Sequence, residues 1–286
     1  MATKYTTLAI AYDFDGTLAP GNMPEHSFIP ALGLTSKKFW EEVKKLAQNN
    51  DMDEILAYMH LLIKKAQSKD LNITRQAIVG HGKGLVFFDG VEDYFDRITN
   101  YGRERHIKIE HYIISSGLKE VIEGTKIGKK FKHIFASSFL YDANGVAIGP
   151  AVAVNYTTKT QFLFRINKGI FNCWDNQTIN RFAPTEERPV PFKNMVYLGD
   201  GETDVPAMKM ISYQGGDAIA VYDKKKRATK KRRPAKEIAE ELIQHGRANY
   251  AVPADYAENS PLDQLIKAII DRAAANASAK KYRELK

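Results

Sequence analysis

The chain of 286 residues is 44% hydrophobic and 10% aromatic, which is enough to bury a large core and excludes global disorder. No apolar run reaches the roughly 20 residues that cross a bilayer, so we expect a soluble protein without a membrane partner. The single cysteine, Cys173, excludes an internal disulfide and a cysteine-based zinc site, and we expect it to be buried. The N-terminal residues show no secretion-signal pattern, which favours a cytoplasmic location.

The net charge of +8 comes from one segment. Residues 224–233 hold eight Lys and Arg and no acid, whereas the rest of the chain holds 34 basic and 34 acidic residues. A charge confined to one segment is typical of a mobile solvated loop rather than of a nucleic-acid-binding surface. A nuclear-import or nucleic-acid patch, and electrostatic steering of anionic substrates, stay open as alternatives.

Apolar strands and amphipathic helices alternate along the chain. LAIAYDFDGT (8–17) is typical of a buried parallel strand that ends in carboxylates, and residues 36–69 predict two amphipathic helices joined near residues 49–51. The glycines of residues 80–90 predict a flexible return from these helices. Further elements are predicted as helices at 91–101, from 118, 160–168, 235–244 and 261–275, strands at 106–115, 194–200, 217–221 and 249–252, and a hairpin turn at 142–145. This alternation favours a parallel sheet covered on both faces, with ligands at the carboxyl ends of its strands.

Two acidic strings follow apolar strands. DFDGT places Asp13 and Asp15 two residues apart, so one carboxylate can attack or bind a metal while the other transfers protons; the other string is GDGETD (199–204). A calcium-binding EF-hand loop is excluded because Leu18 and Pro24 stand where it needs Gly and Glu. Turn formation alone does not explain why both strings follow apolar strands.

Four strings follow one another in an informative order. They are DFDGT (13–17), IISSG with Ser115, TTKTQ with Lys159, and GDGETD. This order resembles the haloacid dehalogenase superfamily of aspartate-nucleophile phosphohydrolases, over residues 8–221. The resemblance implies an α/β fold with a Rossmann-like parallel sheet, helices on both faces and a helical cap. It further implies a discontinuous core of residues 1–20 and 85–286 around a cap of residues 21–84.

The resemblance also implies the chemical roles of the first motif and of the metal site. Asp13 would attack phosphorus and form an aspartyl-phosphate, while Asp15 would act first as general acid and then as general base. Mg²⁺ would be held by Asp13, the backbone carbonyl of Asp15 and Asp200, because acidic side chains need a cation before they can hold a phosphate. Thr17 would order the loop after the nucleophile.

The remaining motifs would bind the phosphate. Ser115 would donate to a phosphoryl oxygen together with the N–H groups of Ser116 and Gly117, which would open the next helix. Lys159 would neutralise charge at phosphorus, and Asp204 would lie either near the metal or against Lys159. Taken alone, Ser115 is also explained as a helix N-cap and Lys159 as a solvated lysine.

The sequence thus predicts a Mg²⁺-dependent phosphomonoester hydrolase that acts on a small phosphorylated metabolite, most similar to phosphoserine phosphatases. Arg75, His81 and Lys83 are candidates for substrate contact, although each is also explained as a structural or solvated side chain. Dehalogenase chemistry is disfavoured because Asp15, Asp200 and Asp204 are all present. A nucleic-acid-binding or regulatory protein that uses residues 224–233 on a degenerate hydrolase fold is the alternative, and no feature indicates an oligomeric state.

Overall fold

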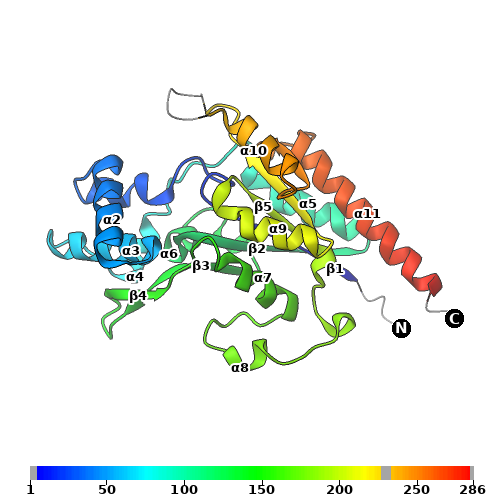
Figure 1. Cartoon of the computed structure of the whole chain (residues 1–286), viewed down its shortest axis with the longest axis horizontal. Helices are drawn as coiled ribbons and strands as arrows, with labels where there is room; N and C mark the ends of the chain where they lie inside the picture. Colours follow the sequence, from blue (N-terminus) through cyan, green and yellow to red (C-terminus); the bar gives the residue numbers. More distant parts are fainter. Residues whose placement is uncertain (1–4, 227–232, 284–286) are drawn as a thin grey trace.

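The computed structural model describes residues 5–226 and 233–283, and these form a seven-stranded sheet of order β4-β3-β2-β1-β5-β6-β7 (Figure 1). All neighbouring strands are parallel except β3 and β4, which form the hairpin predicted around residues 142–145. The strands are β1 (Thr6–Tyr12), β2 (Ile107–Leu118), β3 (His133–Tyr141), β4 (Ala147–Val152), β5 (Met195–Gly199), β6 (Asp217–Tyr222) and β7 (Tyr250–Pro253). The predicted Rossmann-like α/β fold is confirmed.

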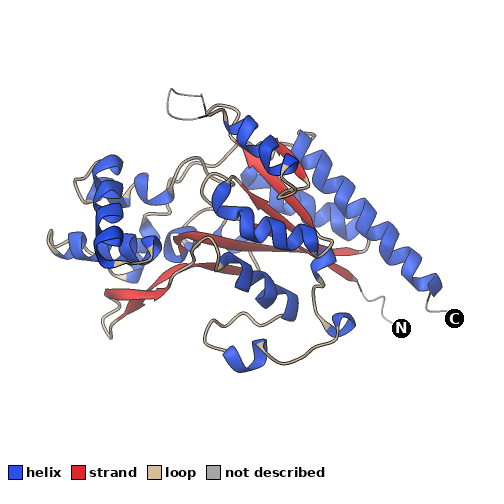
Figure 2. Cartoon of the chain, in the orientation of Figure 1, coloured by secondary structure: helices blue, strands red, loops and turns tan. Residues whose placement is uncertain are grey.

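Strand β1 contributes to two apolar cores, one on each face of the sheet. Leu8, Ile10 and Tyr12 pack into one core, and the alternating Ala9 and Ala11 pack into the other. Helices cover both faces, as Figure 2 shows. The first face packs against α5 (Val91–Glu104) and α11 (Pro261–Arg283), and the second against α7 (Lys159–Lys168), α9 (Val205–Tyr213) and α10 (Ala235–Gln244).

A group of short and long helices, which we call the helical insert, separates β1 from α5. Its elements are η1 (Met23–Glu25), α1 (Phe28–Ala31), α2 (Ser36–Asn50), α3 (Glu54–Gln67) and α4 (Arg75–Gly80). The helical insert lies on the left of Figure 1, where α3 packs against β4. The predicted junction near residues 49–51 is confirmed, because Asp51 adopts a left-handed conformation and the Asp53 side chain caps α3. The division into cap and core domains stays a prediction.

Two backbones touch where the helical insert meets the short helix α6 (Lys119–Glu123). A Cβ atom on Gly82 would overlap the carbonyl oxygen of Val121, and one on Gly124 would overlap the carbonyl oxygen of Val79. Only glycine therefore fits at either position. Close packing explains Gly82, whereas flexibility of residues 80–90 stays a prediction.

Cys173 is exposed, which corrects the expectation that it is buried. It lies in the loop between α7 and α8 (Asn176–Ile179), beside Trp174, whose side chain is 77% exposed. Arg165 holds this loop by donating from Nη2 to the Cys173 carbonyl at 3.0 Å, so the backbone is anchored while the side chain faces outward. Within residues 5–226 and 233–283, no helix has both the length and the apolar character that crossing a bilayer requires.

Candidate active site

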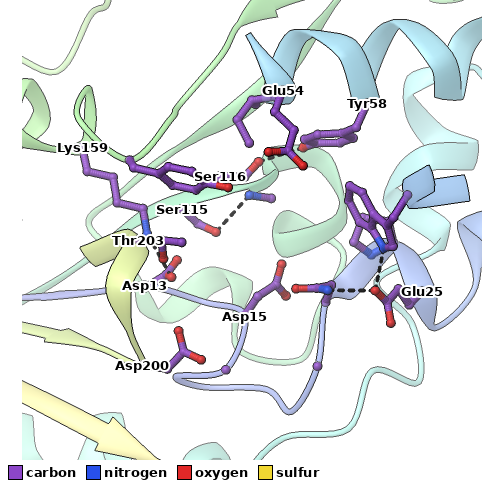
Figure 3. A pocket seen from close by; sticks show the side chains of 18 of the residues that line it. Asp13, Asp15, Glu25, Glu54, Tyr58, Ser115, Ser116, Lys159, Asp200 and Thr203 are labelled. Atoms are coloured by element: carbon purple, nitrogen blue, oxygen red, sulfur yellow. Dashed lines mark hydrogen bonds and ion pairs between the residues drawn. The ribbon is translucent and has the colours of Figure 1, made fainter. Parts of the chain in front are cut away.

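The carboxyl ends of three adjacent strands bring the predicted motifs together. Strands β2 and β3 are added on one side of β1, and β5, β6 and β7 are added on the other. The strand order therefore reverses between β1 and β5. Asp13 follows β1, Asp200 follows β5, and Ser115 lies near the end of β2. All three side chains line a cavity of about 620 Å³ between the sheet and the helical insert (Figure 3).

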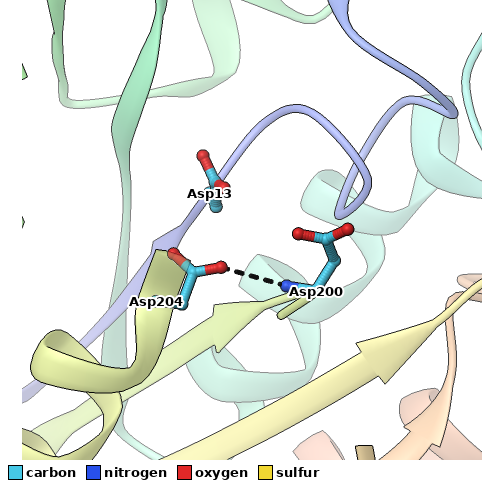
Figure 4. Close-up of side chains that lie close together, drawn as sticks. All are labelled: Asp13, Asp200 and Asp204. Atoms are coloured by element: carbon cyan, nitrogen blue, oxygen red, sulfur yellow. Dashed lines mark hydrogen bonds between the residues drawn. The ribbon is translucent and has the colours of Figure 1, made fainter. Parts of the chain in front are cut away.

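Lys159 is buried between two carboxylates. Its Nζ lies 2.9 Å from Asp13 Oδ2 and 2.6 Å from Asp204 Oδ1. The Tyr197 hydroxyl also donates to Asp204 Oδ1, at 2.6 Å, and the backbone N–H of Asp200 donates to Asp204 Oδ2, at 3.1 Å (Figure 4). Both oxygens of Asp204 are thus engaged, which places Asp204 as the residue that holds Lys159. Burial alone would lower the pKa of Lys159, but Asp13 and Asp204 raise it above its usual range, so this lysine is a permanent cation.

Three carboxylates of the cavity have raised pKa values. Burial raises the pKa of Asp13 to about 6 even though Lys159 opposes the shift, and burial together with Asp204 and Asp13 raises the pKa of Asp200 to about 7. Burial and the neighbouring Asp13 also hold the pKa of Asp15 well above its usual range. Lys159 therefore offsets only part of the cost of ionising these buried carboxylates.

The cluster fits a divalent cation. One carboxylate oxygen from each of Asp13, Asp200 and Asp204 lies within 4.8 Å of the others. Asp13 and Asp200 line the cavity whereas Asp204 does not, so Asp13 and Asp200 are the side chains that can offer oxygen ligands to an ion in the cavity. Hard oxygen ligands in small number are what Mg²⁺ takes from proteins. A contribution from the Asp15 carbonyl stays a prediction.

The loop after Asp13 shapes the cluster. Gly16 has φ +75°, and a Cβ atom there would overlap the carboxylate of Asp200, so the close approach of the two loops requires glycine. The Asp15 side chain points toward the cavity, with Oδ1 accepting the Met23 N–H at 2.8 Å. Thr17 is buried, and its carbonyl accepts from the Tyr256 hydroxyl at 2.8 Å, which anchors the loop through its backbone.

Residues 115–117 belong to β2, at a point where its register against β3 shifts, and do not start a helix. Helix α6 begins only at Lys119, and no side chain caps it, which corrects the expectation that Ser116 and Gly117 open the helix. The Gly117 N–H donates to Ser115 Oγ at 3.1 Å, so the Ser115 hydroxyl hydrogen is free to point elsewhere. The buried Ser116 Oγ has no hydrogen-bond partner among the described residues.

A comparison with protein families shows the family of the chain. The family model described as haloacid dehalogenase-like hydrolase matches residues 10–209, which is most of the chain and contains all four motifs. The chain belongs to this family. A curated relative, an uncharacterized protein of Borreliella burgdorferi, is 29% identical over 236 residues, which cover 74% of this chain and 81% of that protein.

Solved structures share the fold of this haloacid dehalogenase-like hydrolase. A probable phosphoserine phosphatase from Vibrio cholerae is 14% identical, with a TM-score of 0.56 over 95% of this chain and 67% of that chain. A family hydrolase from Salmonella enterica serovar Typhi is 15% identical, with a TM-score of 0.55 over 91% and 70%. A phosphoserine phosphatase in its apo form is 16% identical, with a TM-score of 0.53 over 92% and 98%.

The three candidates for substrate contact lie outside the cavity of this hydrolase. Arg75 pairs with Glu123 at 3.3 Å. The ring of His81 stacks on Phe28 with a centroid distance of 4.6 Å, and Lys83 is exposed. Arg75 and His81 therefore have structural roles, which the sequence analysis gave as the alternative to substrate contact.

Sequence reasoning missed one group of residues that line the cavity. We call it the distal wall, and its residues are Glu25, Trp40, Glu54, Tyr58 and Tyr156. The available signal was weak, because aromatic residues at helical spacing are typical of any core and an acidic residue is common in the first turn of a helix.

The basic run reaches the cavity through one described residue. Lys224, Lys225 and Arg233 each form an ion pair with a nearby acidic side chain, whereas Lys226 lines the cavity. The other residues of the run, 227–232, lie outside the described part of the chain. Steering of substrates and nucleic-acid binding by this run stay predictions.

Proposed function

We propose that the protein is a Mg²⁺-dependent phosphomonoesterase that acts on a small phosphorylated metabolite through an aspartyl-phosphate on Asp13. The observation that carries this proposal is the position of Asp13, whose carboxylate lines the cavity beside Asp200 and 2.9 Å from the Lys159 ammonium. A carboxylate can attack a negatively charged phosphate only where cations offset the repulsion. Lys159 supplies one such charge, and Mg²⁺ bound to Asp13 and Asp200 would supply the rest.

Asp13 and Asp15 divide the chemistry. An oxygen of Asp13 forms a bond to phosphorus while the bond to the leaving oxygen breaks. Asp15 gives its proton to that leaving oxygen, and burial together with the neighbouring Asp13 raises its pKa, which favours the protonated form. In the second step Asp15, now ionised, takes a proton from the water that attacks the aspartyl-phosphate. Inorganic phosphate leaves, and both carboxyl groups return to their starting states.

Four polar groups are available to hold the phosphoryl oxygens. The Ser115 hydroxyl has its hydrogen free, and the Ser116 hydroxyl lacks a partner among the described residues while lining the cavity. Lys159 at the start of α7 and Lys226 after β6 bring positive charge from two different parts of the chain. Because Asp204 and Asp13 fix the Lys159 ammonium in position, little reorganisation is needed when charge develops on the phosphoryl group.

Hydrolysis of 4-nitrophenyl phosphate with and without Mg²⁺ tests the proposal. We expect turnover that requires Mg²⁺ and falls by at least about 10⁴-fold in Asp13→Asn, because the nucleophile is lost. Asp93→Asn, a matched change on the exposed side of α5, should keep full activity. Equal turnover by wild type and Asp13→Asn would exclude Asp13 as the nucleophile.

A further inference from the structure

The distal wall faces the catalytic groups across the cavity. Figure 3 shows Glu54 and Tyr58 on the opposite side from Asp13 and Asp200. A phosphate held at Asp13 would therefore direct the rest of its ester toward these side chains. The distal wall is the part of the cavity that can select the alcohol.

Hydrogen bonds fix the orientation of the distal wall. Trp40 donates from Nε1 to Glu25 Oε1 at 2.7 Å, and Asn22 donates from Nδ2 to the same oxygen at 2.8 Å. The Tyr58 hydroxyl donates to the Ser116 carbonyl at 2.7 Å, and the rings of Trp40 and Tyr58 lie 5.8 Å apart at 63°. Both rings line the cavity, so the half-buried Trp40 and, over the 3% of its surface that is exposed, Tyr58 can contact a ligand.

The charge of the distal wall is negative. Glu25 Oε2 and the Glu54 carboxylate form no hydrogen bond or ion pair with any residue in the described ranges, and both residues line the cavity. The basic residues among the described lining are Lys159 and Lys226, and neither belongs to the distal wall. A second anionic group on the substrate would meet two carboxylates there, whereas a cation would meet two opposite charges and aromatic faces.

We propose that the cavity takes phosphate monoesters of a cationic alcohol, with the positively charged nitrogen held between the carboxylates of Glu25 and Glu54 and the rings of Trp40 and Tyr58. This inference rests on the proposed phosphatase function. It disfavours phosphoserine, whose carboxylate would be repelled by the same wall. Positive nitrogen beside carboxylates and aromatic faces is the arrangement by which proteins hold ammonium groups.

Pairs of esters that differ only in charge test the proposal. Choline phosphate and its carbon isostere, 3,3-dimethylbutyl phosphate, form one pair, and ethanolamine phosphate and propyl phosphate form the other. We expect kcat/KM to favour the cationic member of at least one pair by about tenfold or more, and the two pairs distinguish quaternary from primary ammonium. Phosphoserine should be a poorer substrate than ethanolamine phosphate.

Amino-acid substitutions test whether the distal wall causes the preference for cationic esters. Glu54→Gln should reduce the ratio of kcat/KM between cationic and neutral esters by roughly tenfold. Glu41→Gln removes the same charge from the exposed side of α2 and should leave the ratio unchanged. A ratio near one in wild type, with 4-nitrophenyl phosphate still hydrolysed, would overturn the cationic site and leave the phosphatase standing.

Binding measurements cover the opposite case, in which no ester is hydrolysed and the proposed function fails. The chain has two tryptophans, Trp40 and Trp174, so Trp174→Phe leaves Trp40 as the reporter. Choline phosphate or ethanolamine phosphate should then change the fluorescence of Trp40 saturably, and the neutral isosteres should do so only at much higher concentration. Equal responses to charged and neutral esters would overturn the cationic site independently of turnover.

Discussion

Replacing Asp200 by asparagine should make the metal-free protein more stable. Asp200 lies beside Asp13 and Asp204, and burial together with these two carboxylates raises its pKa from 3.8 to about 7. A raised pKa means that the folded state disfavours the ionised form relative to the unfolded chain. The cost is complete above about pH 7, shrinks as the pH falls, and is absent below the unfolded value of 3.8.

The size of the effect follows from this shift. A change from 3.8 to about 7 corresponds to an upper limit of roughly 4 kcal/mol at 1.36 kcal/mol per unit. Water in the cavity and relaxation of the neighbouring side chains reduce it, so we expect Asp200→Asn to gain about 1–3 kcal/mol at pH 8. For a chain of this length that is an increase of roughly 2–6 °C in Tm.

Thermal unfolding at pH 8 in EDTA, and again in Mg²⁺, measures the stability that Asp200→Asn gains and the stability that each protein gains from the cation. Wild type should be the less stable protein in EDTA and should gain more from Mg²⁺, because the cation offsets the repulsion that the substitution removes. Asp93→Asn on α5 serves as the control and should shift stability by less than about 0.5 kcal/mol. An Asp200→Asn protein that is less stable than wild type in EDTA, or that gains equally from Mg²⁺, would refute this reasoning.

Three further changes test separate parts of the structure. Gly16→Ala should cost about 1–2 kcal/mol at its φ of +75° and abolish Mg²⁺-dependent turnover, because its Cβ would displace the Asp200 carboxylate; unchanged calorimetry and kinetics would contradict this. Burial lowers the pKa of His111 to about 4, so wild type should lose up to about 3 kcal/mol between pH 6.5 and 4, and urea unfolding of His111→Gln should show a correspondingly weaker acid dependence. Lys226→Met should raise KM for phosphate esters about threefold to tenfold with kcat little changed, and a loss confined to kcat would argue against its contact with the phosphate.

The sequence predicted which side chains would meet at the carboxyl ends of the central strands. Strands that run parallel bring their carboxyl ends to one edge, so apolar runs that end in Asp13, Ser115 and Asp200 had to converge once the sheet formed. The sequence left open whether Asp204 lies near the metal or against Lys159, because both positions agree with the same motif. Its contact with Lys159 depends on how α7 packs against the start of α9, which no local pattern reports.

The distal wall could not be predicted because its residues follow ordinary helical patterns. Trp40 and Tyr58 recur at the same spacing as the apolar residues that are simply buried between α2 and α3. Which of them faces a cavity depends on the orientation of the helical insert relative to the sheet. Cys173 shows the converse error, since small size favours burial only where the backbone lies inside the core.

The backbone contact at Gly82 and Gly124 limits how the two parts of the molecule can move. Side chains can slide past one another by changing rotamers, but main chains in direct contact have no such freedom. We therefore expect any rotation of α2 and α3 relative to the sheet to pivot near this backbone contact, with little displacement of α6. Since α6 begins two residues after Gly117, such a movement would leave residues 115–117 in place and would have to break the hydrogen bond from the Tyr58 hydroxyl to the Ser116 carbonyl.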